Sequence, residues 1–550
     1  MTCRWSSCAL ACLSLLIATG CGASAPTVGA HAMGTPSGAP AALGRFAQLN
    51  PDSLEEVIET LEPLVHSDML RLVIGHLPES LRMVNESGPT PLFDELLSLK
   101  ETLRSAGAIA VYADFDRLKA RLDSVPPTSR YASPHATHER QLALLQVEVL
   151  GWHAAIEVAH ELGGPLVNEA FLQKLPSQFG HFGRALFDAL VPADATYKTL
   201  LAAYATLQGQ LNALDGPETQ LPVDTDWYPT LFGTKKPRIL LLRKRLAELG
   251  FFAPPVSEMR SFDSSIERQL RAFQTRHSLE PTGRPNVESA RCLNVSLSRR
   301  IAEVAGALQQ RRQDPLRGVP ERLSLNLPAF ELQRFSGGER IATHKVVIGA
   351  NEPDIDPFGE RRGPINRTPT LVSSITQIVL NPTWEVPRRI KELVLDPLAD
   401  HDPRRYDDFH LITGPDGVEQ AIQLPGPKNA LGRVKFVLSG TPIVLHGTPG
   451  RRPFKLRQRA LSHGDVRVQM APDLAKGLLA SDGNEITPKH VASVLKTRHE
   501  TFVTLETPVP VSIYYTTVDV GPDGSVRFLP DVYDSLEEGR GAELARTLGP

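Results

Sequence analysis

The stretch Leu461–Val468, taken together with His446, constrains this chain more than any other sequence feature. It contains the run Ser-His-Gly-Asp-Val-Arg, and His446 lies nineteen residues before the Asp465 of that run. A histidine can act as a base, and backbone amides beside a glycine can face a developing oxyanion, so the pattern suits acyl transfer. The residue after Gly464 is where a nucleophile is expected, and this chain has Asp465 there.

Length and composition indicate a multidomain protein of ordinary polarity. The 550 residues exceed what one hydrophobic core holds, so we expect three or more domains. Hydrophobic residues make up 41% of the chain, charged residues 22%, and the net charge is −3. Nucleic-acid binders usually carry a basic excess, and we therefore expect no nucleic-acid partner.

The first 21 residues are typical of a bacterial export signal. Arg4 supplies positive charge, and Cys8–Ala18 is an apolar run too short to span a membrane as a folded helix. The run leads into Ala-Thr-Gly-Cys ending at Cys21, which resembles a lipobox and predicts lipid attachment there. Ordinary signal cleavage after Ala25 is the alternative.

The mature chain is then expected to be tethered to a membrane of the cell envelope. Residues 22–45 are rich in Ala, Gly, Pro, Ser and Thr, which predicts a flexible tether. Gly22 follows the cysteine, and without an Asp there we favour the outer membrane over inner-membrane retention. The expected location is the periplasm, as an outer-membrane lipoprotein.

Apolar periodicity predicts a helical scaffold domain over residues 46–213. Glu139–Leu162 is expected to be a long buried helix rather than a membrane span, because Glu148 and Glu157 interrupt its apolar surface. The sequence alone assigns no chemistry to this domain, and one alternative is that it acts by itself as a partner-binding platform.

We expect no metal and no cofactor. His135 and His138 stand at the start of a predicted helix, but no third ligand can be placed beside them. A solvated helix N-terminus explains these residues better than a metal site.

Residues 236–300, after a Pro-rich linker over 214–235, predict a small three-helix unit. Their pattern resembles peptidoglycan-binding domains of the three-helix type, although Ser289 stands where that family usually has Thr. The positions that carry the resemblance are Phe273, Gln274, Leu279, Gly283, Leu293 and Asn294. A small helical bundle without that function is the alternative. A polar, Arg-rich helical linker is expected over 301–320.

From Leu323 onward the apolar period changes from helical to β, which predicts a domain over 321–535 and a polar tail over 536–550. The charged stretch 387–420 predicts an inserted, mobile flap. A hairpin should turn at Ser336-Gly337-Gly338. Strands are expected at 330–335, 341–348, 372–380, 502–505 and 509–517.

Several ordered segments of this domain resemble the YkuD-like catalytic domain of L,D-transpeptidases. They are Thr368-Pro369, Asn381–Pro387, Gln423–Phe436, Leu445–Pro449 and the run around Asp465. With the preceding unit, residues 236–520 resemble the large periplasmic L,D-transpeptidases. The resemblance implies a multidomain α+β protein with a helical N-terminal region, a three-helix peptidoglycan-binding domain and a β-rich catalytic domain with an inserted flap.

The resemblance also implies a chemistry and a role for each matched position. Members of the family attack a peptidoglycan stem peptide with a cysteine thiolate and pass the acyl group to an amine. By position, His446 is the base, and Gly464 with the amide of residue 465 lines the oxyanion site. The positions implied to shape the turn and the substrate cleft are Ser462, His463, Arg467, Gly447, Trp384 and Asn429. Peptidoglycan stem peptides are thus the implied partner.

The departure from the family lies at the nucleophile, where Asp465 replaces the cysteine. A carboxylate attacks an amide poorly, because the product would be a high-energy anhydride. Three interpretations stay open: a pseudoenzyme that acts as a scaffold or regulator of an active wall enzyme, a transpeptidase or L,D-carboxypeptidase that uses His446 with Asp465 or Ser462, and a sequence error or tolerated change. We favour the first, and whether the chain is an enzyme is open at this point.

Overall fold

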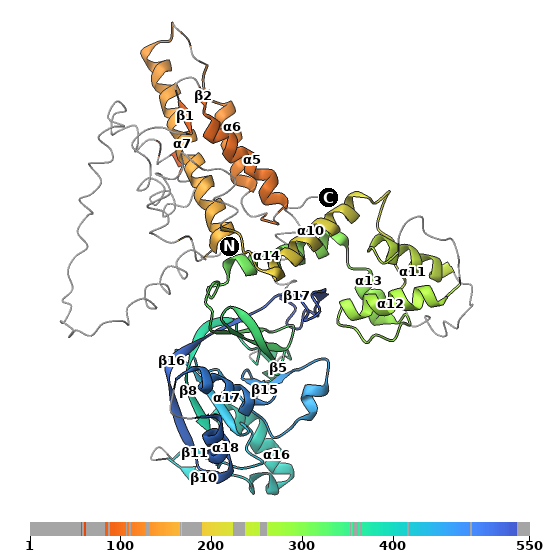
Figure 1. Cartoon of the computed structure of the whole chain (residues 1–550), viewed down its shortest axis with the longest axis vertical. Helices are drawn as coiled ribbons and strands as arrows, with labels where there is room; N and C mark the ends of the chain where they lie inside the picture. Colours follow the sequence, from red (N-terminus) through yellow and green to blue (C-terminus); the bar gives the residue numbers. More distant parts are fainter. Residues whose placement is uncertain are drawn as a thin grey trace, which may run out of the picture.

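The structure is a computed structural model of the whole chain, shown in Figure 1. The residues that it describes are 57, 60–61, 83–85, 88–105, 107–108, 112–127, 129, 131–164, 167, 190–223, 237–252, 261–352, 354–355, 361–362, 366–414, 417–483 and 487–535. The predicted signal, Cys21, the tether over 22–45 and the tail over 536–550 lie outside the described residues.

The N-terminal region is built around α7 (Pro134–Gly163), which packs against α5 (Pro91–Ser105) and α6 (Tyr112–Asp123). Ser133 caps α7 by accepting a hydrogen bond from the amide of Ala136. Within the described residues, α7 is long and apolar enough to cross a membrane, and 89% of its most apolar stretch is buried inside the protein. It is therefore a core helix here.

The hydrogen bonds of Glu148 explain why an acidic residue lies inside this apolar helix. It accepts hydrogen bonds from the amides of Met83 (2.8 Å) and Val84 (3.1 Å), and from the indole of Trp152 (2.9 Å). These amides begin a short hairpin, β1 (Val84–Asn85) and β2 (Gly88–Pro89). The region is thus helical with one small hairpin, and not helical throughout.

The helix expected as part of a polar linker over 301–320 is instead α14 (Leu297–Gln313), a core element that packs on α10 (Ala195–Asn212). Its Arg312 is fully buried and forms a 2.5 Å ion pair with Glu161 near the end of α7. Arg317 donates to the carbonyls of Leu162 (3.2 Å) and Gly163 (3.3 Å). Cations placed on the last carbonyls of a helix are favourable, because those carbonyls lack intrahelical partners.

The unit expected over 236–300 contains α11 (Pro237–Glu248), α12 (Ser264–Arg276) and α13 (Val287–Leu293) around an apolar core. The buried amide of Gln274 accepts a hydrogen bond from the amide of Gly283 (2.7 Å) and donates to the hydroxyl of Ser289 (3.0 Å). Gly283 has φ +70°, a conformation that favours glycine. The Gln, Gly and Ser of the sequence pattern therefore form one hydrogen-bonded corner of this unit.

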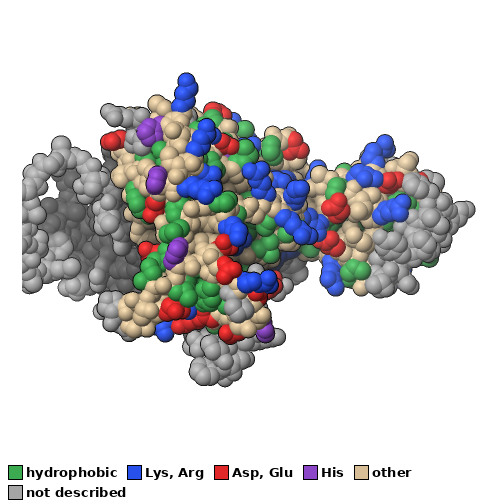
Figure 2. Space-filling model, turned by 90° about the horizontal axis from the view of Figure 1, so that it is seen from below, with side chains coloured by type: hydrophobic (Ala, Val, Ile, Leu, Met, Phe, Trp, Pro, Cys, Tyr) green, Lys and Arg blue, Asp and Glu red, His purple; other side chains and the backbone are tan. Residues whose placement is uncertain are grey.

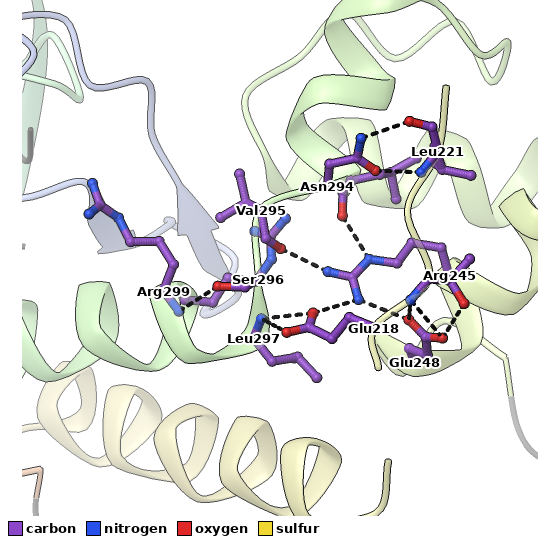
Figure 3. Close-up of polar contacts among 12 residues, drawn as sticks. Glu218, Leu221, Arg245, Glu248, Asn294, Val295, Ser296, Leu297 and Arg299 are labelled. Carbon is purple, nitrogen blue, oxygen red and sulfur yellow. Dashed lines mark hydrogen bonds and ion pairs between the residues drawn. The ribbon is translucent and has the colours of Figure 1, made fainter. Parts of the chain in front are cut away.

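The guanidinium of Arg245, which is 0% exposed, joins this unit to its neighbours (Figure 3). It lies 2.7 Å from the carboxylate of Glu218 and 2.9 Å from that of Glu248. It also donates to the carbonyls of Leu293 (2.7 Å) and Val295 (2.8 Å). One buried cation thus ties the incoming segment to α11 and to the chain that enters α14.

The C-terminal domain is a nine-stranded sheet with the order β14-β5-β15-β13-β12-β8-β16-β3-β4, in which β4 also pairs with β5. The strands are β3 (Arg322–Asn326), β4 (Glu331–Ser336), β5 (Glu339–Gly349), β8 (Leu371–Leu380), β12 (Val434–Leu438), β13 (Val444–His446), β14 (Ala460–Ser462), β15 (Val466–Val468) and β16 (Thr501–Tyr514). The helices α17 (Ala471–Ser481) and α18 (Pro488–Thr497) contribute buried side chains to its core. The two strands expected within 502–517 form one strand, with a bulge between Thr504 and Val509.

The insertion over 387–420 is a folded unit in this structure. It contains α15 (Arg388–Ile390), a π-helical turn (Lys391–Leu395), α16 (Asp396–His401), a 3₁₀ turn (Pro403–Tyr406) and β10 (His410–Thr413). The strand β10 forms a small sheet with the flanking strands β11 (Glu419–Gln423) and β9 (Trp384–Glu385). The ammonium of Lys391 lies 3.1 Å from Asp396 and 3.2 Å from Glu419, which joins its helical part to its sheet. These charge pairs explain why so polar a stretch adopts regular structure.

A last hairpin, β17 (Val518–Val520) and β18 (Val526–Phe528), lies beside α12 and α14 (Figure 1). The ring of His277 is stacked between Phe273 (4.0 Å between centroids) and Phe528 (4.9 Å). The C-terminal segment therefore packs directly on the three-helix unit.

We predict that Arg245→Met loosens the three-helix unit. The substitution leaves Glu218 and Glu248 largely buried without their cation, and breaking such a pair costs about 3–5 kcal/mol. The amides of α11 should then exchange hydrogen faster, which mass spectrometry of peptides from 237–248 measures. The matched control is Arg268→Met on the exposed side of α12, with an expected change within about 0.5 kcal/mol. Equal protection of α11 in the two variants would contradict the assigned role.

Candidate functional site

The strands β12, β13 and β15 bring three charged or titratable residues into one row. Lys435 pairs with His446 across the antiparallel strands, and His446 pairs with Arg467 across the parallel ones. Residues paired across strands carry their side chains on the same face of the sheet. His446, the base position, thus lies between two cations, one of which, Lys435, the sequence analysis missed.

His446 is held as a neutral imidazole. Its side chain is only 5% exposed, and its Nδ1 lies 2.6 Å from the carbonyl oxygen of Gly447. Burial, followed by the positive charge of Arg467, lowers the pKa of His446 to about 4, and Lys435 acts in the same direction. Backbone contacts with Gly447 and Leu431 oppose this shift only in part.

Asp465 is directed at the backbone of β13. Its Oδ1 accepts a hydrogen bond from the amide of Val444 at 3.0 Å. Burial raises the pKa of this carboxyl group, while the Val444 amide and the charges of Lys435 and Arg467 oppose the rise. The carboxylate therefore has a backbone partner two residues before His446, in a partly desolvated place beside two cations.

The turn that carries Asp465 is held by a network of hydrogen bonds from outside the turn. Gly464 has φ +117°, and its carbonyl accepts a 2.7 Å hydrogen bond from the hydroxyl of Thr368. That hydroxyl also accepts from the amide of Gly349 (2.9 Å). The hydroxyl of Tyr533 accepts from the amide of Thr368 (3.0 Å) and donates to the carbonyl of Gly349 (2.9 Å). The turn is thus fixed by buried groups from three distant parts of the chain.

Two members of this network had no signal in the sequence. Thr368 lies in a segment that the family resemblance had matched, but Tyr533 follows the last strand and Gly349 ends β5. Nothing local marks either residue, because the hydrogen bonds of Tyr533 to Thr368 and to Gly349 span 165 and 184 positions of sequence.

Ser462 is buried and used within the turn. Its hydroxyl donates to the carbonyl of Asp465 at 2.5 Å and accepts from the amide of Gly464 at 3.4 Å. The amide of Gly464, one of the backbone groups implied to line an oxyanion site, therefore contacts a side chain of the turn. His463 is exposed and Arg467 is half-buried.

Asn429 and Trp384, which the resemblance placed near the substrate cleft, belong to the frame beside it. The amide nitrogen of buried Asn429 donates to the carbonyls of Pro382 (3.0 Å) and Gln423 (3.0 Å), so it joins two of the matched segments. Trp384 lies on β9, with its ring 6.2 Å from that of Phe409 in the insertion. The contacts of both side chains are thus made inside the protein.

The insertion also approaches the turn. Arg389 of α15 donates to the side-chain oxygen of Asn366 (3.2 Å). The carbonyl oxygen of Asn366 lies 3.9 Å from where a Cβ on Gly464 would stand.

Among the described residues, no group of three or more His, Cys, Asp or Glu could hold a metal ion.

Comparison with known proteins gives the same two domains. Residues 320–491 match the family model "L,D-transpeptidase catalytic domain", and residues 235–293 match "Putative peptidoglycan binding domain". A curated "Putative L,D-transpeptidase" of Haemophilus influenzae is 28% identical over 239 residues, which is 40% of this chain. The match spans 46% of that relative's length.

Solved structures of L,D-transpeptidases are also similar to this chain. One from Xylanimonas cellulosilytica matches at 14% identity over 55% of this chain and 100% of that one, with a TM-score of 0.18. One from Stackebrandtia nassauensis matches at 12% identity over 50% of this chain and 88% of that one, with a TM-score of 0.19. By its two family matches, the chain carries an L,D-transpeptidase catalytic domain of the YkuD family, preceded by a domain of the peptidoglycan-binding family.

Proposed function

We propose that this chain is an exported cell-envelope protein that binds peptidoglycan stem peptides through a catalytically impaired L,D-transpeptidase domain. It acts as a scaffold or as a regulator of an active wall enzyme, tethered to the outer membrane by a lipid at Cys21. The observation that carries the proposal is Asp465, which stands where the resemblance places the cysteine. Its Oδ1 accepts a hydrogen bond from the amide of Val444.

The chemistry of the carboxylate supports loss of acyl transfer. Attack of Asp465 on a peptide bond would form an anhydride and expel an amine, whereas a thiolate forms a thioester that an amine then resolves. The hydrogen bond from Val444 stabilises the carboxylate in place and lowers its nucleophilicity further. The position therefore favours binding over reaction.

The base position supports the same proposal. A general base is most effective when its pKa lies near the working pH, and His446 is shifted to about 4 by burial and Arg467. The hydroxyl of Ser462, the other nucleophile considered, already donates to the carbonyl of Asp465. Neither His446 nor Ser462 is part of an activated nucleophile–base pair in this structure.

A hydrolase is the competing candidate, and one observation favours it. Burial raises the pKa of Asp465, which would make its carboxylate a better base toward water. Such an L,D-carboxypeptidase would release D-alanine from a stem tetrapeptide and would lose this activity in Asp465→Asn.

We predict that Asp465→Cys restores reactivity toward a carbapenem. Thr368 and Tyr533 hold the turn independently of the residue at 465, so a thiol placed there should be presented as in the family. Mass spectrometry of the intact protein should show a covalent adduct in this variant and none in the unsubstituted chain. Asp465→Asn is the control, since it removes the carboxylate without supplying a nucleophile, and it should stay unmodified.

A carbapenem adduct or D-alanine release by the unsubstituted chain would contradict the impaired site. An unreactive Asp465→Cys variant would instead contradict the claim that only the nucleophile is lost.

We predict that His446 stays neutral from pH 8 to pH 5 and titrates near pH 4. Its folded pKa lies below that of an unfolded histidine, so the unfolded chain takes up a proton first and stability falls as pH drops from about 6.5 toward 4. NMR of the 13C-labelled imidazole, assigned with His446→Gln, measures this pKa. Arg467→Gln should raise it, and Arg268→Gln should leave it unchanged. Titration of His446 near 6.5 in the unsubstituted chain would refute the prediction.

A further inference from the structure

Two cationic side chains flank His446 and have no direct partner among the described residues. Lys435 and Arg467 lie on either side of it in one row across β12, β13 and β15. The neighbouring residues Phe436 and Leu445 lie in the core of the domain, so the row is on the face of the sheet that points away from this core. Both cations are half-buried, and neither makes a hydrogen bond or an ion pair with any residue that the structure describes.

Asp465 is the carboxylate that acts on this row, and it is shared between the two cations. Its negative charge acts on Arg467, and the positive charges of Lys435 and Arg467 both act on Asp465. Its hydrogen bond, however, comes from the amide of Val444 at 3.0 Å, and neither cation lies within ion-pair distance of it. A second carboxylate placed at this row would therefore meet two cations that share one distant partner.

The positive charge belongs to this row and not to the surface as a whole. Figure 2 shows the molecule from below, where the catalytic domain lies, and Lys, Arg, Asp and Glu side chains are mixed over this face. The chain as a whole has a net charge of −3. Exposed charges are screened over about 8 Å at physiological ionic strength. Any preference of the site for a carboxylate thus depends on the nearby cations Lys435 and Arg467.

We propose that Lys435 and Arg467 form a subsite for the terminal carboxylate of a stem peptide, and that Asp465 weakens this subsite by competing for the same two cations. The inference rests on the proposed function, which supplies the peptide. In an acyl-transfer site the base returns its proton to the leaving amine, so the last residue of a bound peptide lies beside His446. Its carboxylate then meets the row, where hydrogen bonds from cations are about twice as strong as neutral ones.

The subsite distinguishes peptides by their ends. A stem that ends in a free carboxylate supplies the negative charge that Lys435 and Arg467 lack. A stem whose last carboxyl group is part of an amide bond leaves the two half-buried cations without that partner, and such a loss opposes binding. The chain therefore selects free stem ends over amidated ones.

The test uses the full chain and two probes, N-acetyl-L-Ala-γ-D-Glu-meso-diaminopimelyl-D-Ala and its C-terminal amide, with binding measured by calorimetry. Lys435→Gln should weaken binding of the free acid about fivefold, because a charge-assisted pair is lost. Asp465→Asn keeps an acceptor for the amide of Val444 and should tighten binding of the free acid about threefold. Neither substitution should change binding of the amide. The matched control is Lys489→Gln on the exposed side of α18.

A second measurement shows that Lys435→Gln keeps the fold. The charge of Lys435 lowers the pKa of His446, so this variant should raise that pKa, which NMR of the labelled imidazole measures. The tighter binding expected of Asp465→Asn cannot result from unfolding. The two substitutions therefore test the subsite in opposite directions.

The proposal is overturned if Lys435→Gln binds the free acid as Lys489→Gln does, or if Asp465→Asn binds it no more tightly than the unsubstituted chain. It is also overturned if the effects persist with the amide, because another carboxylate of the peptide would then be the one bound. In these cases, retained binding of the unsubstituted chain to purified sacculi would leave the proposed function standing. A chain that binds neither sacculi nor the free acid would contradict both.

Discussion

The buried ion pair between Arg312 and Glu161 is the interaction on which the arrangement of the chain depends. Two charges are taken out of water there, which is tolerated because they lie 2.5 Å apart and Arg312 also donates to the carbonyl of Glu161 and to the hydroxyl of Tyr197. The pair fixes the end of α14 against the end of α7. At the start of α14, the carboxylate of Glu218 accepts from the amide of Leu297 and meets Arg245. One helix thus sets the positions of the N-terminal and three-helix units.

The C-terminal segment connects this frame to the candidate site. Phe528 stacks on His277 of the three-helix unit. Five residues later, the hydroxyl of Tyr533 accepts a hydrogen bond from the amide of Thr368, and the hydroxyl of Thr368 donates to the carbonyl of Gly464. The segment therefore joins the three-helix unit to the turn around Asp465.

Local patterns predicted those parts of the structure that depend on neighbours in sequence. The glycine pair at 337–338 turns β4 into β5, and the apolar run at 139–162 lies in the buried helix α7. Gln274, Gly283 and Ser289 form one corner because a buried amide needs partners for both of its atoms. The turn at 461–468 lies beside His446, since β13 and β15 are neighbouring strands.

Features that depend on distant contacts could not be predicted in this way. An Arg-rich helix indicates solvent exposure, yet Arg300 and Arg312 are buried because carbonyls and a carboxylate from other elements surround them. Lys435 reaches His446 only through the register of β12 on β13, and Tyr533 reaches the turn through the path of the last segment. The charged insertion was expected as a flap, but Lys391 and its acidic partners give it regular structure.

We propose that the catalytic domain keeps a peptide-binding frame while Asp465 removes acyl transfer. Its most direct test is to incubate the full chain with purified sacculi rich in tetrapeptide stems, and to measure bound protein and free D-alanine in the same sample. We predict saturable binding with no D-alanine above that of sacculi alone. Release of D-alanine in proportion to the protein added, or a failure to bind the sacculi, would contradict the account.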